Sequence, residues 1–208
     1  MAKKILLFGG SFDPPHLGHE LVIHNALSQL EPDELWVMPC WEHAFGKKMT
    51  RAKQRLAMCR LLVSGIGDKR VIVSTLEIDE QLFGSTYETL KLLHSPRFNI
   101  PDTKYDFLIG SDQLAGFHRW REYKKLLKEM TFYVYPRAGF KVEPWYEEMR
   151  LIEGGEVSWV SSTQVRKKIA KDEGIGDLVP ERIAEYIFSN GLYRWEAGFW
   201  SWNDQLKE

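Results

Sequence analysis

Short apolar runs alternate with longer amphipathic segments along most of this 208-residue chain. The runs end at glycine, proline or serine, as buried strands often do, and they predict strands at 5–8, 35–38, 71–74, 105–109, 132–135 and 157–160. The segments between them carry apolar residues at helical spacing, which predicts helices near 18–30, 51–63, 87–94, 123–129, 162–170 and 181–189. This alternation favours a Rossmann-like, doubly wound α/β fold with a mostly parallel sheet, helices on both faces and a helical C-terminal end.

The length of the chain and its 44% of apolar residues suit one domain with a sizeable core. We expect residues 1–194 to form that domain. Residues 195–208 hold tryptophans at positions 195, 200 and 202, and we expect them to be a C-terminal appendage.

The formal net charge of −1 argues against a general basic surface for nucleic acid or an anionic membrane. Any phosphate binding therefore needs a local site. The apolar run at 5–8 is too short for a signal peptide, and no run approaches the roughly 18 residues of a membrane helix. Cys40 and Cys59 have no CxxC spacing, which disfavours a disulfide or zinc site. We expect a cytoplasmic protein without nucleic-acid or membrane partners, and a homo-oligomer is compatible with the sequence.

The segment 9–19, GGSFDPPHLGH, carries the strongest chemical signal. Gly9 and Gly10 follow an expected strand and allow a ligand to approach the backbone closely. The helix that follows offers N–H groups and a partial positive charge to a phosphate. His16 and His19 are three residues apart, so both can donate hydrogen bonds to one polyphosphate. The alternative is a plain strand–turn–helix connection with two surface histidines, which explains less of the segment.

A metal site built on His16, His19 and His24 is disfavoured by their spacing. Metal-binding histidine pairs on a helix are commonly four residues apart, and no cysteine or carboxylate completes a set here. We therefore expect no protein ligand for a metal ion.

The segment 160–166, VSSTQVR, carries a second signal. Ser161 can cap a helix while Gln164 reaches back as a capping box, so the segment could be a well-made helix start and nothing more. The same turn nevertheless offers hydroxyl and guanidinium donors from Ser162, Thr163 and Arg166. Two phosphate-binding helix ends in one chain would suit a triphosphate.

Segments 10–19 and 161–166 together resemble the nicotinate/nicotinamide mononucleotide adenylyltransferases of the HxGH nucleotidyltransferase superfamily. The resemblance covers nearly the whole chain and would make residues 1–194 the nucleotidyltransferase domain. It extends to the strand-end segment 109–112 beside the adenosine, the segment 86–90 of the pyridine pocket, the aromatic Trp120, and the C-terminal segments 178–180, 186–187 and 192–193. Sister families that act on phosphopantetheine or glycerol phosphate share the HxGH string but are not expected to show the Trp120 segment.

The resemblance implies transfer of the adenylyl group of ATP, with its Mg²⁺, to nicotinate or nicotinamide mononucleotide in NAD biosynthesis. The products would be deamido-NAD or NAD, with pyrophosphate. The implied catalytic residues are His16, His19 and Arg166. The implied ATP contacts are Gly9, Gly10, Ser11, Phe12, His16, His19, Gly110, Asp112, Ser162, Thr163 and Arg166. The implied contacts of the pyridine mononucleotide are Ser11, Phe12, Lys47, Thr86, Tyr87, Asp112, Trp120 and Arg137.

One segment departs from the family pattern. Many bacterial members carry a Pro-Pro-His-Lys string after the second strand, where this chain has EHAFGKK at 42–48. Either Lys47 or Lys48 could replace the family lysine. Lys47, Lys48, Arg51 and Arg55 equally fit a solvated basic face, and Arg137 fits a phosphate ligand or a plain surface charge.

Two other functions remain open at this point. The chain could adenylate another phosphorylated small molecule, such as flavin mononucleotide, or it could sense NAD or ATP without catalysis. Between the two pyridines, the N-terminus of a helix at 86–90 would favour the nicotinate carboxylate, whereas Glu88 in the same turn opposes it. We expect nicotinate mononucleotide to be preferred and nicotinamide mononucleotide also to be accepted.

Overall fold

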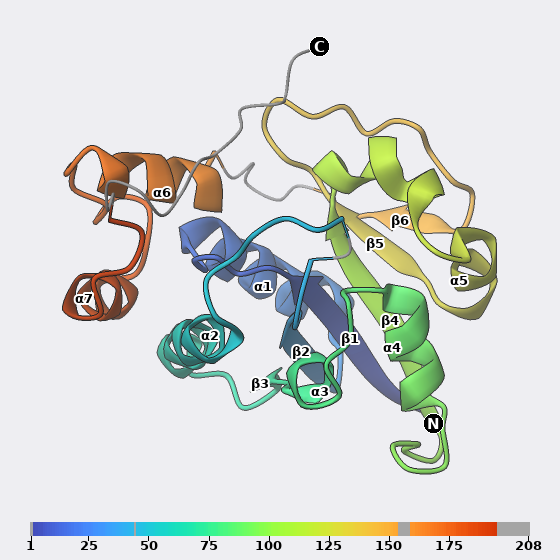
Figure 1. Cartoon of the computed structure of the whole chain (residues 1–208). Helices are drawn as coiled ribbons and strands as arrows, with labels where there is room; N and C mark the ends of the chain where they lie inside the picture. The colour runs from blue at the N-terminus through green and yellow to red at the C-terminus, as the bar shows by residue number, and fades with distance from the viewer. Residues whose placement is uncertain (1, 44, 154–158, 195–208) are drawn as a thin grey trace.

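The sheet is parallel throughout the part of the chain that the computed structural model describes, residues 2–43, 45–153 and 159–194. Its strands are β1 (Lys3–Gly10), β2 (Glu34–Pro39), β3 (Val71–Val73), β4 (Thr103–Gly110), β5 (Phe132–Tyr135) and β6 (Met149–Leu151). They lie in the order β3-β2-β1-β4-β5-β6 (Figure 1), and every neighbouring pair is parallel. This arrangement confirms the predicted α/β class.

Helices cover both faces of the sheet (Figure 1). They are α1 (Leu17–Leu30), α2 (Ala52–Ile66), α3 (Leu76–Asp79), α4 (Thr86–Leu93), the 3₁₀ helix η1 (Ser111–Arg119), α5 (Tyr123–Glu129), α6 (Ser162–Ala170) and α7 (Glu181–Ser189). One buried apolar cluster includes residues of α1, α2, α6 and α7, and the other includes residues of α4, η1 and α5. Along β1, Leu6 and Phe8 belong to the first cluster and Ile5 and Leu7 to the second, as the two-residue period of a strand requires.

The sixth strand lies earlier in the chain than the sequence pattern predicts. We expected a strand at 157–160, but β6 is Met149–Leu151, which pairs with Phe132–Val134 of β5. Trp159 and Val160 are not in a strand, and 157–158 lie outside the described residues. The other three-residue edge strand, Val71–Val73, is wholly apolar and was predicted at 71–74, whereas the sequence of β6 is Met-Arg-Leu and forms no apolar run.

The order of the strands reverses its direction between β1 and β4. From β1 the chain builds outward through β2 and β3, and it then returns to add β4, β5 and β6 on the other side. Such a switch point opens a crevice at the carboxyl ends of the two central strands, where α/β proteins bind ligands. Gly9 and Gly10 end β1 and Gly110 ends β4. The glycines that the sequence placed after these two strands therefore lie at this crevice.

No helix in the described ranges is long and apolar enough to cross a membrane. Cys40 and Cys59 are buried and unpaired. The expected C-terminal appendage at 195–208 lies outside the described residues.

Gly9 is required by its neighbour on β4. A Cβ atom built on Gly9 would lie 2.8 Å from Cζ of Phe107, which is closer than van der Waals contact allows. We expect Gly9→Ala to lower the free energy of unfolding by about 1–3 kcal/mol, because Phe107 would have to move within a packed core. Urea denaturation measures this change.

Gly116 in η1 offers a matched control, since a Cβ built there meets nothing within 4 Å. Gly116→Ala should change stability by less than about 0.5 kcal/mol. Equal effects of the two substitutions would contradict the packing argument.

Candidate active site

The loop between β1 and α1 places its backbone, more than its side chains, at the crevice. Phe12 has a positive φ of 47°, and its ring is buried against Phe8 and His19 at centroid distances of 5.4 and 4.8 Å. A predicted contact of Phe12 with substrate can therefore come only from its main chain. A Cβ on Gly10 would lie 3.2 Å from the Phe12 ring, so Gly10 lets this ring pack under the end of β1.

The N-terminus of α1 has fewer unpaired amides than the sequence suggested. The first residue of the helix, Leu17, donates its N–H to the carbonyl of Leu178 at 2.9 Å. This bond ties the helix start to the C-terminal part of the chain. It also leaves less of the backbone to bind a phosphate, so more of that work falls on His16 and His19.

The rings of His16 and His19 lie against each other at the start of α1. Their centroids are 3.7 Å apart and their planes differ by 34°. The His16 backbone N–H donates to Nδ1 of His19 at 3.1 Å. Because Nδ1 of a neutral imidazole that accepts a hydrogen bond carries no proton, the His19 proton sits on Nε2. His19 can therefore donate from Nε2 while it remains uncharged.

Both histidines are neutral at pH 7. Burial and then the charge of Arg137 lower the pKa of His19 to about 3. Burial, followed by His19 and Arg137, holds the pKa of His16 well below its usual value. A bound triphosphate would oppose these effects, because its negative charge favours the protonated imidazole. The two imidazoles are neutral in the free protein, and the charge of a bound triphosphate would favour their protonation. Such donors suit the stabilisation of a developing anion.

Helix α6 begins at the second motif in the predicted manner. Its cap is Ser161, whose side chain accepts a hydrogen bond from the Gln164 N–H at 3.2 Å. Hence the sequence pattern of a capped helix start at this position is confirmed in the fold.

The first turn of α6 packs directly on the loop after β1. Ser162 Oγ donates to the carbonyl of Pro14 at 2.8 Å. The guanidinium of Arg166 donates to the carbonyl of Asp13 and, at 3.1 Å, to Thr163 Oγ1. The two motifs are about 150 positions apart in sequence, with separations of 148 and 153 for the bonded pairs, and the fold brings both to one place.

Asp13 joins this centre to two further segments. Its carboxylate accepts a hydrogen bond from the Tyr193 hydroxyl at 2.7 Å and from the Thr50 N–H at 3.2 Å. The residue is 3% exposed. Sequence reasoning placed Asp13 in the motif without a role and noticed Tyr193 only as part of the C-terminal resemblance.

Lys47 rather than Lys48 faces this centre. Lys47 is half-buried, and its pKa is lowered by burial and then by the charge of Arg166, while Asp13 acts in the opposite direction. Lys48 is exposed. Of the two lysines that the sequence left open, Lys47 is therefore the one that is partly buried beside Arg166 and Asp13.

Arg137 is part of the site and not a plain surface charge. Its guanidinium lies 3.1 Å from Asp112 Oδ2 and 3.3 Å from the carbonyl oxygen of Val160. The backbone N–H of Arg137 donates to Ser111 Oγ at 2.9 Å. A Cβ on Gly110 would lie 2.3 Å from Asp112 Oδ1. Glycine at the end of β4 therefore leaves the room that this ion pair occupies.

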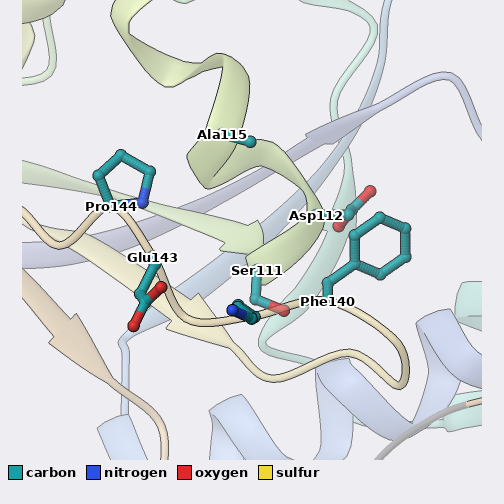
Figure 2. Close-up of a pocket in the computed structure, with 7 residues that line it drawn as sticks. Ser111, Asp112, Ala115, Phe140, Glu143 and Pro144 are labelled. Atoms are coloured by element: carbon teal, nitrogen blue, oxygen red, sulfur yellow. The ribbon is translucent and has the colours of Figure 1, made fainter. Parts of the chain in front are cut away.

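A cavity of about 600 Å³ adjoins this ion pair. Figure 2 shows Glu143 and Pro144, from the chain after β5, on the left, Asp112 and Phe140 on the right, and Ser111 between them. Asp112 Oδ1 is buried without a hydrogen-bond partner among the described residues. An acceptor beside a nucleoside-sized cavity suits a ribose hydroxyl.

Trp120 follows η1 and packs into the aromatic cluster under β4. Its ring lies 5.0 Å from that of Phe117 and 6.1 Å from that of Phe107. Phe107 is also the side chain that crowds Gly9, so a chain of contacts leads from Trp120 to the end of β1. The ring is half-buried, which leaves part of it available to a ligand.

Thr86 and Tyr87 form the first turn of α4, which is tied to the segment after Trp120. Arg121 forms an ion pair with Glu88 at 2.7 Å and lies over the Tyr87 ring at 5.9 Å. Three of the residues predicted to contact the pyridine mononucleotide, Thr86, Tyr87 and Trp120, therefore group on the η1 and α4 side of the crevice. The predicted phosphate residues group on the α1 and α6 side.

The solvated-face interpretation is wrong for Arg55. This residue of α2 is 1% exposed and shares the buried face of the helix with Met58, Cys59 and Leu62. The sequence did hold a signal, since positions 55, 58, 59 and 62 follow helical spacing, but a cation on an apolar face is hard to interpret without its partners.

Comparison with known proteins agrees with this geometry. The cytidylyltransferase-like family model matches residues 7–168. The probable nicotinate-nucleotide adenylyltransferase of Myxococcus xanthus is 34% identical over 192 residues, covering 92% of this chain and 95% of the relative. The chain belongs to the nicotinate-nucleotide adenylyltransferase family. It is therefore a nucleotidyltransferase enzyme.

Two further members of the nicotinate-nucleotide adenylyltransferase family support this placement. The probable enzyme of Halalkalibacterium halodurans is 31% identical over 195 residues, with 92% of each chain covered. The nicotinic acid mononucleotide adenylyltransferase of Plasmodium falciparum, solved in complex with NaAD, superposes with a TM-score of 0.76 at 27% identity. The superposition covers 92% of this chain and 97% of that one.

The protonation state of His19 in this adenylyltransferase can be measured by NMR of ¹⁵N-labelled histidine. We expect the free protein to hold His19 as the neutral Nε2–H tautomer from pH 8 down to pH 5, because its pKa is lowered to about 3. The same histidine in urea-unfolded protein should titrate near 6.5, the model-peptide value. A titration midpoint near 6.5 in the folded protein would contradict the assigned burial of the ring.

Proposed function

We propose that this enzyme transfers the adenylyl group of ATP to nicotinate mononucleotide, giving deamido-NAD and pyrophosphate, and that it accepts nicotinamide mononucleotide less well. The observation that carries the proposal is the contact between the starts of α1 and α6 at Asp13 and Pro14. It gathers neutral histidine donors and an arginine in one place, which suits a triphosphate. The names of the relatives support the choice of acceptor.

In the proposed reaction, a 5′-phosphate oxygen of the mononucleotide forms a bond to the α-phosphorus of ATP. The bond from that phosphorus to the bridging oxygen breaks, and pyrophosphate leaves with the electron pair. The attacking phosphate is already largely ionised at pH 7, so the step needs no general base. Catalysis then rests on positioning and on stabilisation of the charge that moves to the leaving group.

The residues predicted to hold the phosphates and the adenosine have roles that their positions support. His16 and His19 donate to the bridging and β/γ-phosphate oxygens, Arg166 and Thr163 hold the β/γ end, and Lys47 contacts the mononucleotide phosphate. The remaining proposed contacts are the amides of Gly9, Gly10, Ser11 and Phe12, the hydroxyl of Ser162, and the cavity beside Gly110, Asp112 and Arg137 for the adenosine and the ribose.

We propose Mg²⁺ as the ion that accompanies ATP. Within the described ranges, no group of three histidine, cysteine or acidic side chains could hold a metal ion, so phosphate oxygens and water would hold it, as Mg²⁺ prefers. Bound there, the ion would neutralise part of the charge on the leaving pyrophosphate. We also place the enzyme in the cytoplasm, which suits its two buried, unpaired cysteines.

The start of α4 supports the preference for nicotinate. Ser85 precedes the helix and makes no capping hydrogen bond with its side chain, so the first amides of the helix remain to bind a ligand. Glu88, which would repel a carboxylate, is paired with Arg121 at 2.7 Å and with Lys91 at 3.5 Å. Its charge is therefore largely offset, and the helix N-terminus favours a negative group on the pyridine ring.

A pyrophosphate-release assay with a panel of acceptors tests the proposed function. We expect release from ATP only with a pyridine mononucleotide and Mg²⁺, and a kcat/KM several-fold higher for the nicotinate form, which needs a difference of only about 1 kcal/mol. Flavin mononucleotide and phosphopantetheine serve as control acceptors. Turnover with phosphopantetheine and none with either pyridine mononucleotide would overturn the proposal, and ATP binding without turnover on any acceptor would indicate a sensor.

His19→Ala tests the role of the histidine pair. We expect kcat to fall by about 10²- to 10³-fold, as the loss of one preorganised donor to the transition state commonly causes. His24→Ala is the matched control, because His24 lies exposed on the same helix, and it should keep wild-type kcat. Near-normal turnover of a folded His19→Ala enzyme would remove His19 from the mechanism.

A further inference from the structure

Arg55 is a buried cation that the mechanism above does not use. Its side chain, 1% exposed, makes four hydrogen bonds, and all four acceptors are main-chain carbonyls. Nε donates to Thr50 at 2.8 Å, and Nη1 donates to Ser11 at 2.9 Å. Nη2 donates to Cys40 at 2.7 Å and to Trp41 at 2.8 Å. A planar guanidinium is the side chain that can hold several acceptors in such a fixed arrangement.

The four carbonyls come from two different loops. Ser11 belongs to the loop between β1 and α1, whose backbone the proposed mechanism places at the phosphates. The other three acceptors begin and end the loop between β2 and α2, which carries Lys47. One side chain of α2 therefore holds both loops that the proposed site uses for phosphate.

Two backbone N–H groups of the β2–α2 loop donate hydrogen bonds across to the β1 end and the loop that follows it. The Cys40 N–H donates to the carbonyl of Gly10 at 3.0 Å, and the Thr50 N–H donates to Asp13 Oδ2 at 3.2 Å. These bonds lie at the two ends of the β2–α2 loop, and Arg55 binds a carbonyl at each end. They report independently on whether the two loops keep their relative position.

The bond to Ser11 also sets the direction of the next amide. In a trans peptide, the carbonyl and the following N–H point to opposite sides. Because the Ser11 carbonyl points at Arg55, the Phe12 N–H points away from it. Phe12 has a positive φ of 47°, a conformation that non-glycine residues adopt rarely and that the bond from Arg55 helps to hold.

The charge of Arg55 is only partly balanced. Its four hydrogen-bond acceptors carry no formal charge, and Glu77 is the carboxyl on which its charge acts. Burial raises the pKa of Glu77 to about 7, and its side chain accepts a hydrogen bond from Thr89 at 2.7 Å. Because none of its hydrogen-bond acceptors is charged, the guanidinium contributes a positive potential beneath the loop that would hold phosphate.

We propose that Arg55 is a positioning residue for adenylyl transfer, which aligns the Ser11–Phe12 backbone and the Lys47 loop as one unit around the phosphates of both substrates. The inference rests on the proposed function for its catalytic part. Its structural part, the coupling of the two loops by Arg55, stands on the hydrogen bonds alone.

The test compares Arg55→Lys with Arg60→Lys. Arg60 lies exposed on the same helix and outside the site, so Arg60→Lys should match the wild type in every measurement. For Arg55→Lys, we expect kcat to fall by about 10- to 100-fold, because small displacements of positioning groups have effects of that size. The Michaelis constants for ATP and for nicotinate mononucleotide should both rise, which a mere loss of folded protein would not cause.

Amide hydrogen exchange of the free protein tests the coupling without any substrate. In Arg55→Lys, the amides of Cys40 and Thr50 should exchange faster together, by about tenfold or more, while amides of the central strands keep their protection. If the variant does not fold, the wild type decides: a non-hydrolysable ATP analogue should slow both amides together.

The outcomes separate the two proposals. A folded Arg55→Lys enzyme with wild-type kcat, or with unchanged exchange at Cys40 and Thr50, would overturn the role of Arg55, as would an ATP analogue that leaves both wild-type amides unchanged. A wild type that releases no pyrophosphate with any pyridine mononucleotide would overturn the proposed function, and the exchange measurement would still decide the coupling.

Discussion

The hydrogen bonds that converge on Asp13 hold the site together. Its carboxylate binds the Tyr193 hydroxyl and the Thr50 amide, and its carbonyl accepts from Arg166. Four segments that are far apart in sequence therefore meet at one residue. Because Asp13 itself is buried, leaving one of its acceptor oxygens unpaired would be costly. The positions of α1, α6 and the β2–α2 loop all follow from this junction.

The electrostatics of the site explain how a chain with a net charge of −1 can present a positive centre. The cations are local: Arg166, Lys47 and Arg137 lie around the crevice, and each is held by a carbonyl, a carboxylate or burial. Burial, and after it the charge of Arg137, lowers the pKa of His16 and of His19 and keeps both neutral in the free protein. A triphosphate would thus meet donors whose charge increases in response to its own.

The sequence pattern was sufficient to predict the strands with continuous apolar runs and the helices with periodic apolar residues. The strands at 5–8, 35–38 and 105–109 and the helices at 18–30 and 162–170 were predicted, because long periodic runs report directly on burial. The edge strand Met149–Leu151 was not predicted, since its two apolar residues flank Arg150 and form no apolar run. Nor was the 3₁₀ helix Ser111–Arg119, whose shape depends on its packing under β4.

By itself, the sequence determined the fold class and located the two motifs at 9–19 and 160–166, because glycines, caps and histidine spacing act over a few residues. It named Arg55 only as one of four basic residues and could not separate Lys47 from Lys48. The tertiary structure shows that Arg55 is buried, that Lys47 is half-buried and that Lys48 is exposed, because burial depends on segments elsewhere in the chain, such as Ser11 for Arg55 at a separation of 44. It also set the tautomer of His19, since a proton's place on an imidazole follows from the partner that each ring nitrogen meets in the folded chain.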